Sequence, residues 1–249
     1  MGSKNKLKRF RENETFPNVI QPTREEVLNN FSHKGKWHSF FNNNNPIVIE
    51  LGCGKGEYTI ALAEKNPDKN FIGIDIKGAR FWRGAKTALE NNLTNVAFIR
   101  TQIELVDYIF DKAEVDEIWI TFPDPQIKYK RTKHRMTNHD FLLKYHEILK
   151  ENGVVNLKTD SEFMHGYTLG LLHGEGHEIL HANHDVYKDY YSPGEVTGTQ
   201  TFYEKKYLEK GSEVAVEGKL TSRSYETKEG EKRYVTEVVV NELLMLGKK

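Results

Sequence analysis

The chain has 249 residues, and its 36 lysine and arginine residues balance 36 aspartate and glutamate residues, so the formal net charge at pH 7 is zero. Zero net charge argues against a uniformly basic nucleic-acid-binding protein but leaves local clusters of charge open. The single cysteine, Cys53, excludes a disulfide framework within the chain and a zinc site built from several cysteines. No apolar run reaches the roughly 20 residues of a membrane span. The charged N-terminus has no apolar segment typical of a signal peptide, so we expect a cytoplasmic protein without a membrane partner.

After a basic, polar lead-in at 1–45, short apolar runs alternate with amphipathic segments. The pattern predicts strands at 47–51, 71–76, 96–99, 117–122, 154–157 and 177–180, and helices at 57–64, 79–90, 141–149 and 163–172. The Asn152-Gly153 pair is expected to stop the third of these helices. Strands alternating with helices indicate an α/β fold with a mostly parallel sheet covered on both faces. We therefore assign 46–205 to one α/β domain and 206–249 to a β-rich tail.

A glycine-rich loop lies between the first predicted strand and the first predicted helix, with Gly52, Gly54 and Gly56 in alternate positions. Its spacing differs from that of dinucleotide-binding loops and of P-loops. Asp75 ends the second predicted strand, where a carboxylate can accept both hydroxyls of a ribose, and Glu50 adds negative charge nearby. Ribose binding without a pyrophosphate cradle suits S-adenosylmethionine, whose sulfonium end is cationic. The alternative is a tight strand–helix turn that binds nothing.

Asp124 follows the fourth predicted strand and has proline on both sides, which places it at the mouth of the ligand crevice. A basic run follows, with five lysine and arginine residues and no acid between 128 and 135. The first eleven residues carry five more cations and again no acid. Such runs suit phosphate backbones, so Lys128 and Arg131 are predicted to anchor phosphate, although a solvated surface is the simpler alternative. Beside a methyl-donor pocket, a polyanionic substrate becomes the preferred interpretation.

Several segments together resemble one family. They are Glu50-Leu-Gly-Cys-Gly-Lys-Gly56, Phe122-Pro-Asp-Pro125, the basic run ending in Arg135-Met-Thr137, Lys158-Thr-Asp160 and Thr201-Phe-Tyr-Glu204. In this order they are similar to the bacterial tRNA (guanine-N7)-methyltransferase family over about residues 1–205. The resemblance implies a seven-stranded, Rossmann-like class I methyltransferase fold and S-adenosylmethionine as the methyl donor. It implies tRNA as the partner, with N7 of the variable-loop guanosine, position 46 in standard tRNA numbering, as the acceptor.

The resemblance also implies roles for individual residues. The residues implied to contact the cofactor are Glu50, Asp75, Gln102 and Asp124. Those implied to contact the nucleotide are Lys128, Asp160 and the stretch Thr201 to Glu204. Two positions depart from the family pattern: Gln126 stands where tryptophan commonly follows Asp-Pro, and Gln102 stands where an acid or asparagine is frequent.

The chemistry expected at this site needs no general base, because guanine N7 carries a lone pair and no proton. Catalysis then depends on alignment of N7, methyl and sulfur and on stabilising the positive charge of the methylated base. Asp124 is the candidate catalytic residue, and its alternative role is a carboxylate that caps its own loop. Four histidines, His173, His177, His181 and His184, lie close together in the sequence. Their spacing matches no single helix or strand face, so we expect surface or sheet histidines and no metal site.

The tail resembles the C-terminal half of bacterial single-stranded DNA-binding proteins over about 44 residues, without the strands that would begin that barrel. Segments 214–216 and 234–240 flank a turn-rich stretch and predict an antiparallel hairpin. We favour 213–220 as the last strand of the methyltransferase sheet, in which case residues 221–249 are dispensable for folding. The alternative is a nucleic-acid platform using Arg223, Tyr225 and Arg233.

Two other functions are weighed against the tRNA methyltransferase. A non-catalytic protein that binds single-stranded nucleic acid would need neither the glycine loop nor Asp75 and Asp124. A small-molecule methyltransferase would not need the two basic runs. The sequence leaves a monomer or a homodimer equally open.

Overall fold

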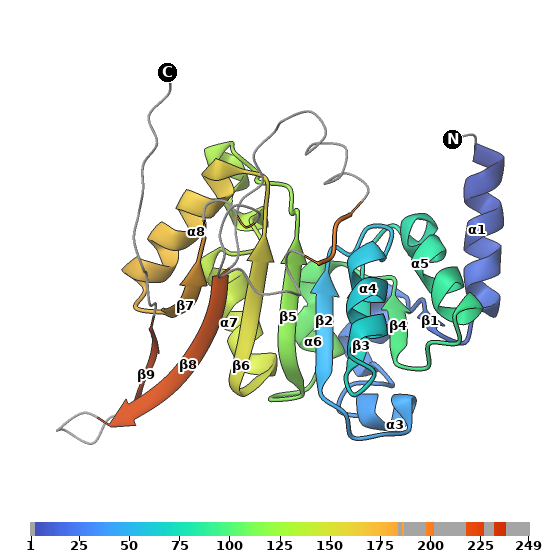
Figure 1. Ribbon diagram of the computed structural model, residues 1–249, viewed down its shortest axis with the longest axis horizontal. Helices are drawn as coiled ribbons and strands as arrows, with labels where there is room; N and C mark the ends of the chain where they lie inside the picture. The colour runs from blue at the N-terminus through green and yellow to red at the C-terminus, as the bar shows by residue number, and fades with distance from the viewer. Residues whose placement is uncertain (1–2, 184–185, 187–197, 202–217, 227–231, 238–249) are drawn as a thin grey trace.

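The computed structural model describes residues 3–183, 186, 198–201, 218–226 and 232–237. Its centre is one sheet with strand order β1-β4-β3-β2-β5-β6-β8-β7, and β9 pairs with β8 (Figure 1). The strands are β1 Val19–Ile20, β2 Ile47–Leu51, β3 Asn70–Ile74, β4 Val96–Ile99, β5 Val115–Thr121, β6 Leu149–Lys158, β7 Glu178–Ala182, β8 Gly218–Glu226 and β9 Lys232–Glu237.

Eight α-helices and two short 3-10 helices belong to the described residues. The α-helices are α1 Ser3–Thr15, α2 Arg24–Asn30, α3 Trp37–Phe41, α4 Glu57–Lys65, α5 Gly78–Glu90, α6 Val106–Ile109, α7 His139–Ile148 and α8 Glu162–Gly174, and the 3-10 helices are η1 Ile103–Leu105 and η2 Tyr129–His134. None of these described helices has the length and apolar character of a membrane span.

The order of the parallel strands places a topological switch point in the middle of the sheet, the position at which open α/β folds form a ligand crevice. β2 pairs in parallel with both β3 and β5, while β4 follows β3 outward and β6 follows β5 in the opposite direction. The chain therefore reverses its direction of travel between β2 and β5, and ligands of open α/β sheets bind at the carboxyl ends of the strands at such a point. These ends are the upward-pointing arrowheads of β2, β5 and β6 in Figure 1.

The expected α/β class is confirmed, but the strand count differs. The resemblance implied seven strands, whereas the described sheet has nine, of which six are parallel. β1 adds a short parallel strand beside β4, and β9 extends the tail hairpin. A second difference concerns Asn152-Gly153, because α7 already ends at Ile148 and the chain enters β6 at once. Asn152 lies inside this strand at φ 62°, so the pair marks an irregular strand and not a helix end.

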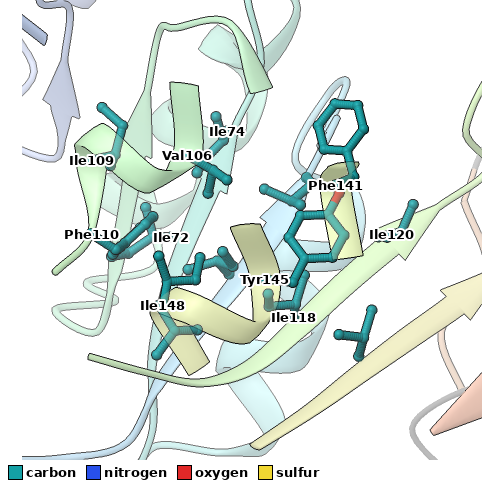
Figure 2. Close-up of a cluster of buried hydrophobic side chains, with 14 of the residues drawn as sticks. Ile72, Ile74, Val106, Ile109, Phe110, Ile118, Ile120, Phe141, Tyr145 and Ile148 are labelled. Atoms are coloured by element: carbon teal, nitrogen blue, oxygen red, sulfur yellow. The ribbon is translucent and has the colours of Figure 1, made fainter. Parts of the chain in front are cut away.

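The core consists of two apolar layers, one on each face of the sheet. Figure 2 shows the larger layer, in which α6 and α7 cover isoleucines of β3 and β5. Tyr145 of α7 is fully buried among these side chains. On the other face, α4 and α5 pack over Phe98 and Trp119. All five residues of β2 are buried, as expected for a parallel strand covered on both sides.

The sequence pattern gave no indication of α1, which packs against α5. Its contacts are mainly polar: the Asn13 side-chain amide donates to the Gly78 carbonyl at 3.0 Å, and the Trp82 indole donates to Glu12 at 2.6 Å. The Arg9 guanidinium lies over the Trp82 ring at 4.7 Å. A helix held by such contacts lacks the apolar periodicity on which sequence-based prediction depends.

The tail forms the predicted antiparallel hairpin, and its first strand belongs to the central sheet. β8 pairs antiparallel with β6 at Asn156 and Lys219, with β7 at Ile179 and Leu220, and with β9 along the hairpin. The strand begins at Gly218, so it lies further along the chain than predicted. The segment 214–216 lies outside the described residues.

This register predicts which truncation the fold tolerates. Removing 218–249 deletes all of β8, which pairs with β6 at Lys219 and with β7 at Gly218, Leu220 and Thr221. We expect that truncation to lower the free energy of unfolding by at least about 2 kcal/mol, because each backbone hydrogen bond contributes roughly 1 kcal/mol. Removing only 227–249 leaves β8 paired with β6 and β7 and serves as the control. Urea unfolding of both variants measures the difference, and equal stabilities would contradict the placement of β8.

Candidate active site

The carboxyl ends of β2, β3 and β5 bring the predicted site residues to one edge of the sheet. Glu50 is the next-to-last residue of β2, Asp75 directly follows β3, and Asp124 follows β5 by three residues. The glycine loop connects β2 to α4 at the same edge. The sequence prediction that these groups share one crevice therefore agrees with the strand order.

The glycine loop folds back onto the end of β3. The Gly52 amide donates to the Ile74 carbonyl at 2.8 Å, and Gly52, Gly54 and Gly56 all have positive φ angles, between 57° and 79°. A Cβ atom at Gly56 would approach the Phe98 ring to 2.6 Å. Backbone conformation and close packing thus both require glycine at this turn.

Asp75 connects the glycine loop to the start of α5. Its Oδ2 accepts the Gly54 amide at 3.1 Å and its Oδ1 accepts the Lys77 amide at 2.7 Å, while only 8% of the residue is exposed. Each carboxylate oxygen can accept more than one hydrogen bond. The carboxylate therefore shapes the loop and retains acceptor capacity for a ligand hydroxyl.

Glu50 joins three elements across the crevice. Its Oε2 accepts the Thr59 amide at 2.8 Å and also the Thr59 hydroxyl, and its Oε1 accepts the Thr121 hydroxyl at 2.5 Å. Thr59 lies in the first turn of α4 and Thr121 ends β5. The side chain is 4% exposed, and no cation pairs with it among the described residues.

The environment of Glu50 works against its ionisation. Burial raises the pKa of this carboxyl from 4.5 to about 7, although the hydrogen bonds from Thr121 and Thr59 favour the charged form. The negative charge of Asp75 adds a smaller increase. A carboxyl group that titrates near neutrality in a crevice is typical of a functional site.

The Asp124 loop is held in a strained conformation. Asp124 is exposed, and its Oδ1 accepts the Gln126 amide at 3.0 Å. Phe122 and Gln126 have φ angles of 49° and 46°, a left-handed conformation that costs non-glycine residues roughly 1–3 kcal/mol each. The Phe122 amide donates to the Lys158 carbonyl at 2.6 Å, which anchors the start of the loop to the end of β6.

Lys158 also holds the segment 198–201 at this edge. Its ammonium group donates to the Thr199 carbonyl at 3.2 Å and lies over the rings of Tyr58 and Phe122, at 5.5 and 5.7 Å. Thr201, a predicted nucleotide contact, is half-buried just beyond this anchor. Glu204, predicted with it, lies outside the described residues.

Three other predicted residues lie at the same edge with exposed side chains. Gln102 follows β4 and accepts a hydrogen bond from the Arg24 guanidinium, so part of its bonding capacity is already used. Asp160 lies two residues beyond β6. Lys128 immediately precedes η2. Their binding roles stay predictions.

The cations of the basic run differ in their exposure to solvent. Arg131 is exposed and donates weakly to the Gln126 side chain at 3.4 Å, while His134 lies 4.0 Å from Glu104 of η1. Arg135, by contrast, is 5% exposed and belongs to the packing of the loop. The run therefore presents four exposed cations, and Arg135 is not one of them.

Sequence reasoning missed Thr59, Thr121 and Lys158. Each is a polar residue at the end of an element that borders the glycine loop or the Asp124 loop. Two signals in the sequence could have indicated these residues. One is their position at the ends of elements, and the other is the need of a buried acid at Glu50 for hydrogen-bond donors. Of the histidines, His177 lies 3.1 Å from Glu175. Within the described ranges no cluster of three potential metal-ligating side chains occurs, and His184 lies outside them.

Replacing Glu50 by glutamine is expected to change how stability depends on pH. The pKa of Glu50 is higher in the folded protein than in the unfolded chain, so its stabilising contribution is complete below about pH 4.5 and is lost as the pH rises through about 7. The free energy of unfolding of Glu50→Gln minus that of wild type should therefore be larger at pH 8 than at pH 5. We expect this increase to be about 2–3 kcal/mol. Urea unfolding at both pH values measures this.

The matched control for this experiment is Glu57→Gln, the same chemical change on the first, half-exposed residue of α4. The effects of this change at the two pH values should differ by less than those of Glu50→Gln. A pH-independent effect of Glu50→Gln would contradict the raised pKa.

Comparison with solved structures identifies the fold. The chain is similar to a protein described as "Structure of an Antibiotic Related Methyltransferase", with a TM-score of 0.56 and 19% identity over 74% of this chain and 92% of that one. The 16S rRNA methyltransferase KamB gives a TM-score of 0.56 and 11% identity, over 81% and 93% of the two chains. At these identities the likeness shows a shared methyltransferase fold and nothing more.

Comparison of sequences identifies the family. The family model described as "Putative methyltransferase" matches residues 44–216, and that of the single-strand binding protein family matches residues 191–246, in agreement with the resemblance of the tail. A tRNA (guanine-N(7)-)-methyltransferase of Christiangramia forsetii is 74% identical over 216 residues, 86% of this chain and 96% of the relative. That of Porphyromonas gingivalis is 47% identical over 80% of this chain and 82% of the relative. The chain therefore belongs to the tRNA (guanine-N(7)-)-methyltransferase family.

Proposed function

We propose that this protein transfers the methyl group of S-adenosylmethionine to N7 of a guanosine in tRNA, and that the acceptor is the variable-loop guanosine at position 46. The observation that carries the proposal is the crevice between β2 and β5. On one side it holds the glycine loop with Glu50 and Asp75, and on the other the exposed Asp124 beside a basic segment. The activity for which the relatives are named supports the same reaction.

The residues of the crevice fit S-adenosylmethionine. Asp75 has free acceptor capacity for ribose hydroxyls, and Gly52 and Gly54 let a ligand approach the backbone. Glu50 is a buried acid without a cationic partner among the described residues. A sulfonium group near it supplies the missing opposite charge and favours its ionised form.

The bound cofactor supplies an electrophilic methyl group, and the protein's contribution is positioning and electrostatics. Guanine N7 attacks with its own lone pair, so no side chain needs to remove a proton. The product base is positively charged, and the Asp124 carboxylate, oriented by the Gln126 amide, is placed to stabilise that charge. Asp160 and Thr201 lie at the same edge and are proposed to contact the nucleotide, together with Glu204.

The exposed cations Lys128 and Arg131 are proposed to bind the tRNA backbone beside the crevice. All the residues proposed to bind cofactor or tRNA lie within 46–205, the proposed methyltransferase domain. Residues 206–249 form the proposed tail. The second candidate, a non-catalytic protein that binds single-stranded nucleic acid, is supported only by the match over 191–246. It gives no role to Glu50, Asp75 or Asp124.

The decisive experiment is methylation of a tRNA transcript with labelled S-adenosylmethionine, followed by nucleoside analysis. The label should appear as 7-methylguanosine, and a transcript with adenosine at position 46 should remain unlabelled. Asp124→Ala should lower the rate by about 100-fold, as expected when a group that stabilises charge in the transition state is removed. Absence of 7-methylguanosine would overturn the proposed function, and a wild-type rate in Asp124→Ala would remove Asp124 from the chemistry.

Neutralising Lys128 and Arg131 together should weaken tRNA binding. If both contact phosphate, the plot of log affinity against log salt concentration should become less steep by about 1–2 units. The control is Lys36→Ala with Lys112→Ala, the same change in charge at exposed positions near the amino ends of β2 and β5. Binding titrations at several salt concentrations provide the slopes, and an unchanged slope in the first variant would contradict the phosphate contacts.

A further inference from the structure

Arg135 differs from the other cations of the basic run in its environment. Lys128, Lys130, Arg131 and Lys133 are exposed, whereas Arg135 is 5% exposed. A buried guanidinium in this position is out of reach of a tRNA phosphate. The role of Arg135 therefore depends on the protein groups that surround it.

The guanidinium of Arg135 is hydrogen-bonded to the loop that carries Asp124. Its Nε and Nη2 both donate to the Gln126 carbonyl at 3.2 Å, and Nη2 also donates to the Ile127 carbonyl at 3.3 Å. The group lies 4.8 Å from the ring centre of Phe163 and 4.3 Å from that of Tyr167, both on α8. No carboxylate pairs with Arg135 within the part of the chain that is described.

Gln126 connects the Arg135 guanidinium to the Asp124 carboxylate through hydrogen bonds. Its amide donates to the Asp124 carboxylate, while its carbonyl accepts from Arg135. Gln126 has a left-handed φ of 46°, so its conformation is one that the rest of the structure must hold in place. The start of the loop is already fixed by the hydrogen bond from Phe122 to Lys158, and Arg135 fixes its end.

We propose that Arg135 is a positioning residue for Asp124, acting through the Gln126 peptide and supported by the aromatic pair of α8. The inference rests on the proposed function of Asp124 and adds a residue to it. Arginine is suited to this role because its planar fork spans two carbonyls while its faces stack on rings. Lysine carries the same charge but offers neither the fork nor the flat faces.

Steady-state kinetics with tRNA separate this role from phosphate binding. Arg135→Met and Arg135→Lys should both lower kcat by at least about 10-fold, with KM for tRNA and the salt dependence of binding within twofold of wild type. Lys133→Met, an exposed cation of the same run, should instead raise KM and flatten the salt dependence. Full activity in Arg135→Lys, or a raised KM and flatter salt dependence in Arg135→Met, would overturn the proposal, because a phosphate ligand needs only the charge.

Amide hydrogen exchange over 122–128 tests the same claim without relying on activity. Exchange there should become faster in both Arg135 variants and should match wild type in Lys133→Met; unchanged exchange in the Arg135 variants would overturn the proposal. If wild type forms no 7-methylguanosine, the proposed function fails while this measurement still reports on the loop. Should Arg135→Met fail to fold, Tyr167→Leu removes one supporting ring and should lower kcat and speed exchange in the same direction.

Discussion

The buried carboxyl group of Glu50 is the constraint around which the crevice is organised. It lies where the strand order reverses, and it takes hydrogen bonds from the first turn of α4 and from the last residue of β5. The positive end of the α4 dipole and these donors favour its charge, whereas burial opposes it. The group therefore lies near the midpoint between its two protonation states at neutral pH. A fold optimised for stability alone would place an apolar residue at this position.

The two loops beside Glu50 are built on different principles. The glycine loop is held by hydrogen bonds to the end of β3, and its three positive φ angles require a residue type that is visible in the sequence. The Asp124 loop is strained at residues other than glycine, and it is held by Lys158 of β6 and by Arg135, whose guanidinium lies on two rings of α8. The shape of the glycine loop is therefore apparent from residue types along the chain, whereas the presentation of Asp124 depends on tertiary packing.

This difference explains how much the sequence could predict. The strands β2 to β5 were found because β-branched runs bounded by glycine or proline have a clear pattern, and Glu50 and Asp75 followed from their positions at strand ends. The helix α1 was missed because Asn13, Arg9 and Trp82 join it to α5 without an apolar stripe. The burial of Arg135 was missed because a charge pattern along the chain carries no information about two aromatic rings on α8.

The tail shows the same dependence on tertiary context. The methyltransferase family match ends at residue 216, yet β8, which begins at Gly218, fills the place between β6 and β7. Main-chain pairing tolerates many sequences, so a segment similar to single-strand binding proteins can supply this strand. Near Leu220 the backbone bonds that hold β8 against β6 and β7 are the bonds an oligonucleotide-binding barrel would also need. In one molecule, the part of β8 near Leu220 can pair within the methyltransferase sheet or within such a barrel, but not within both.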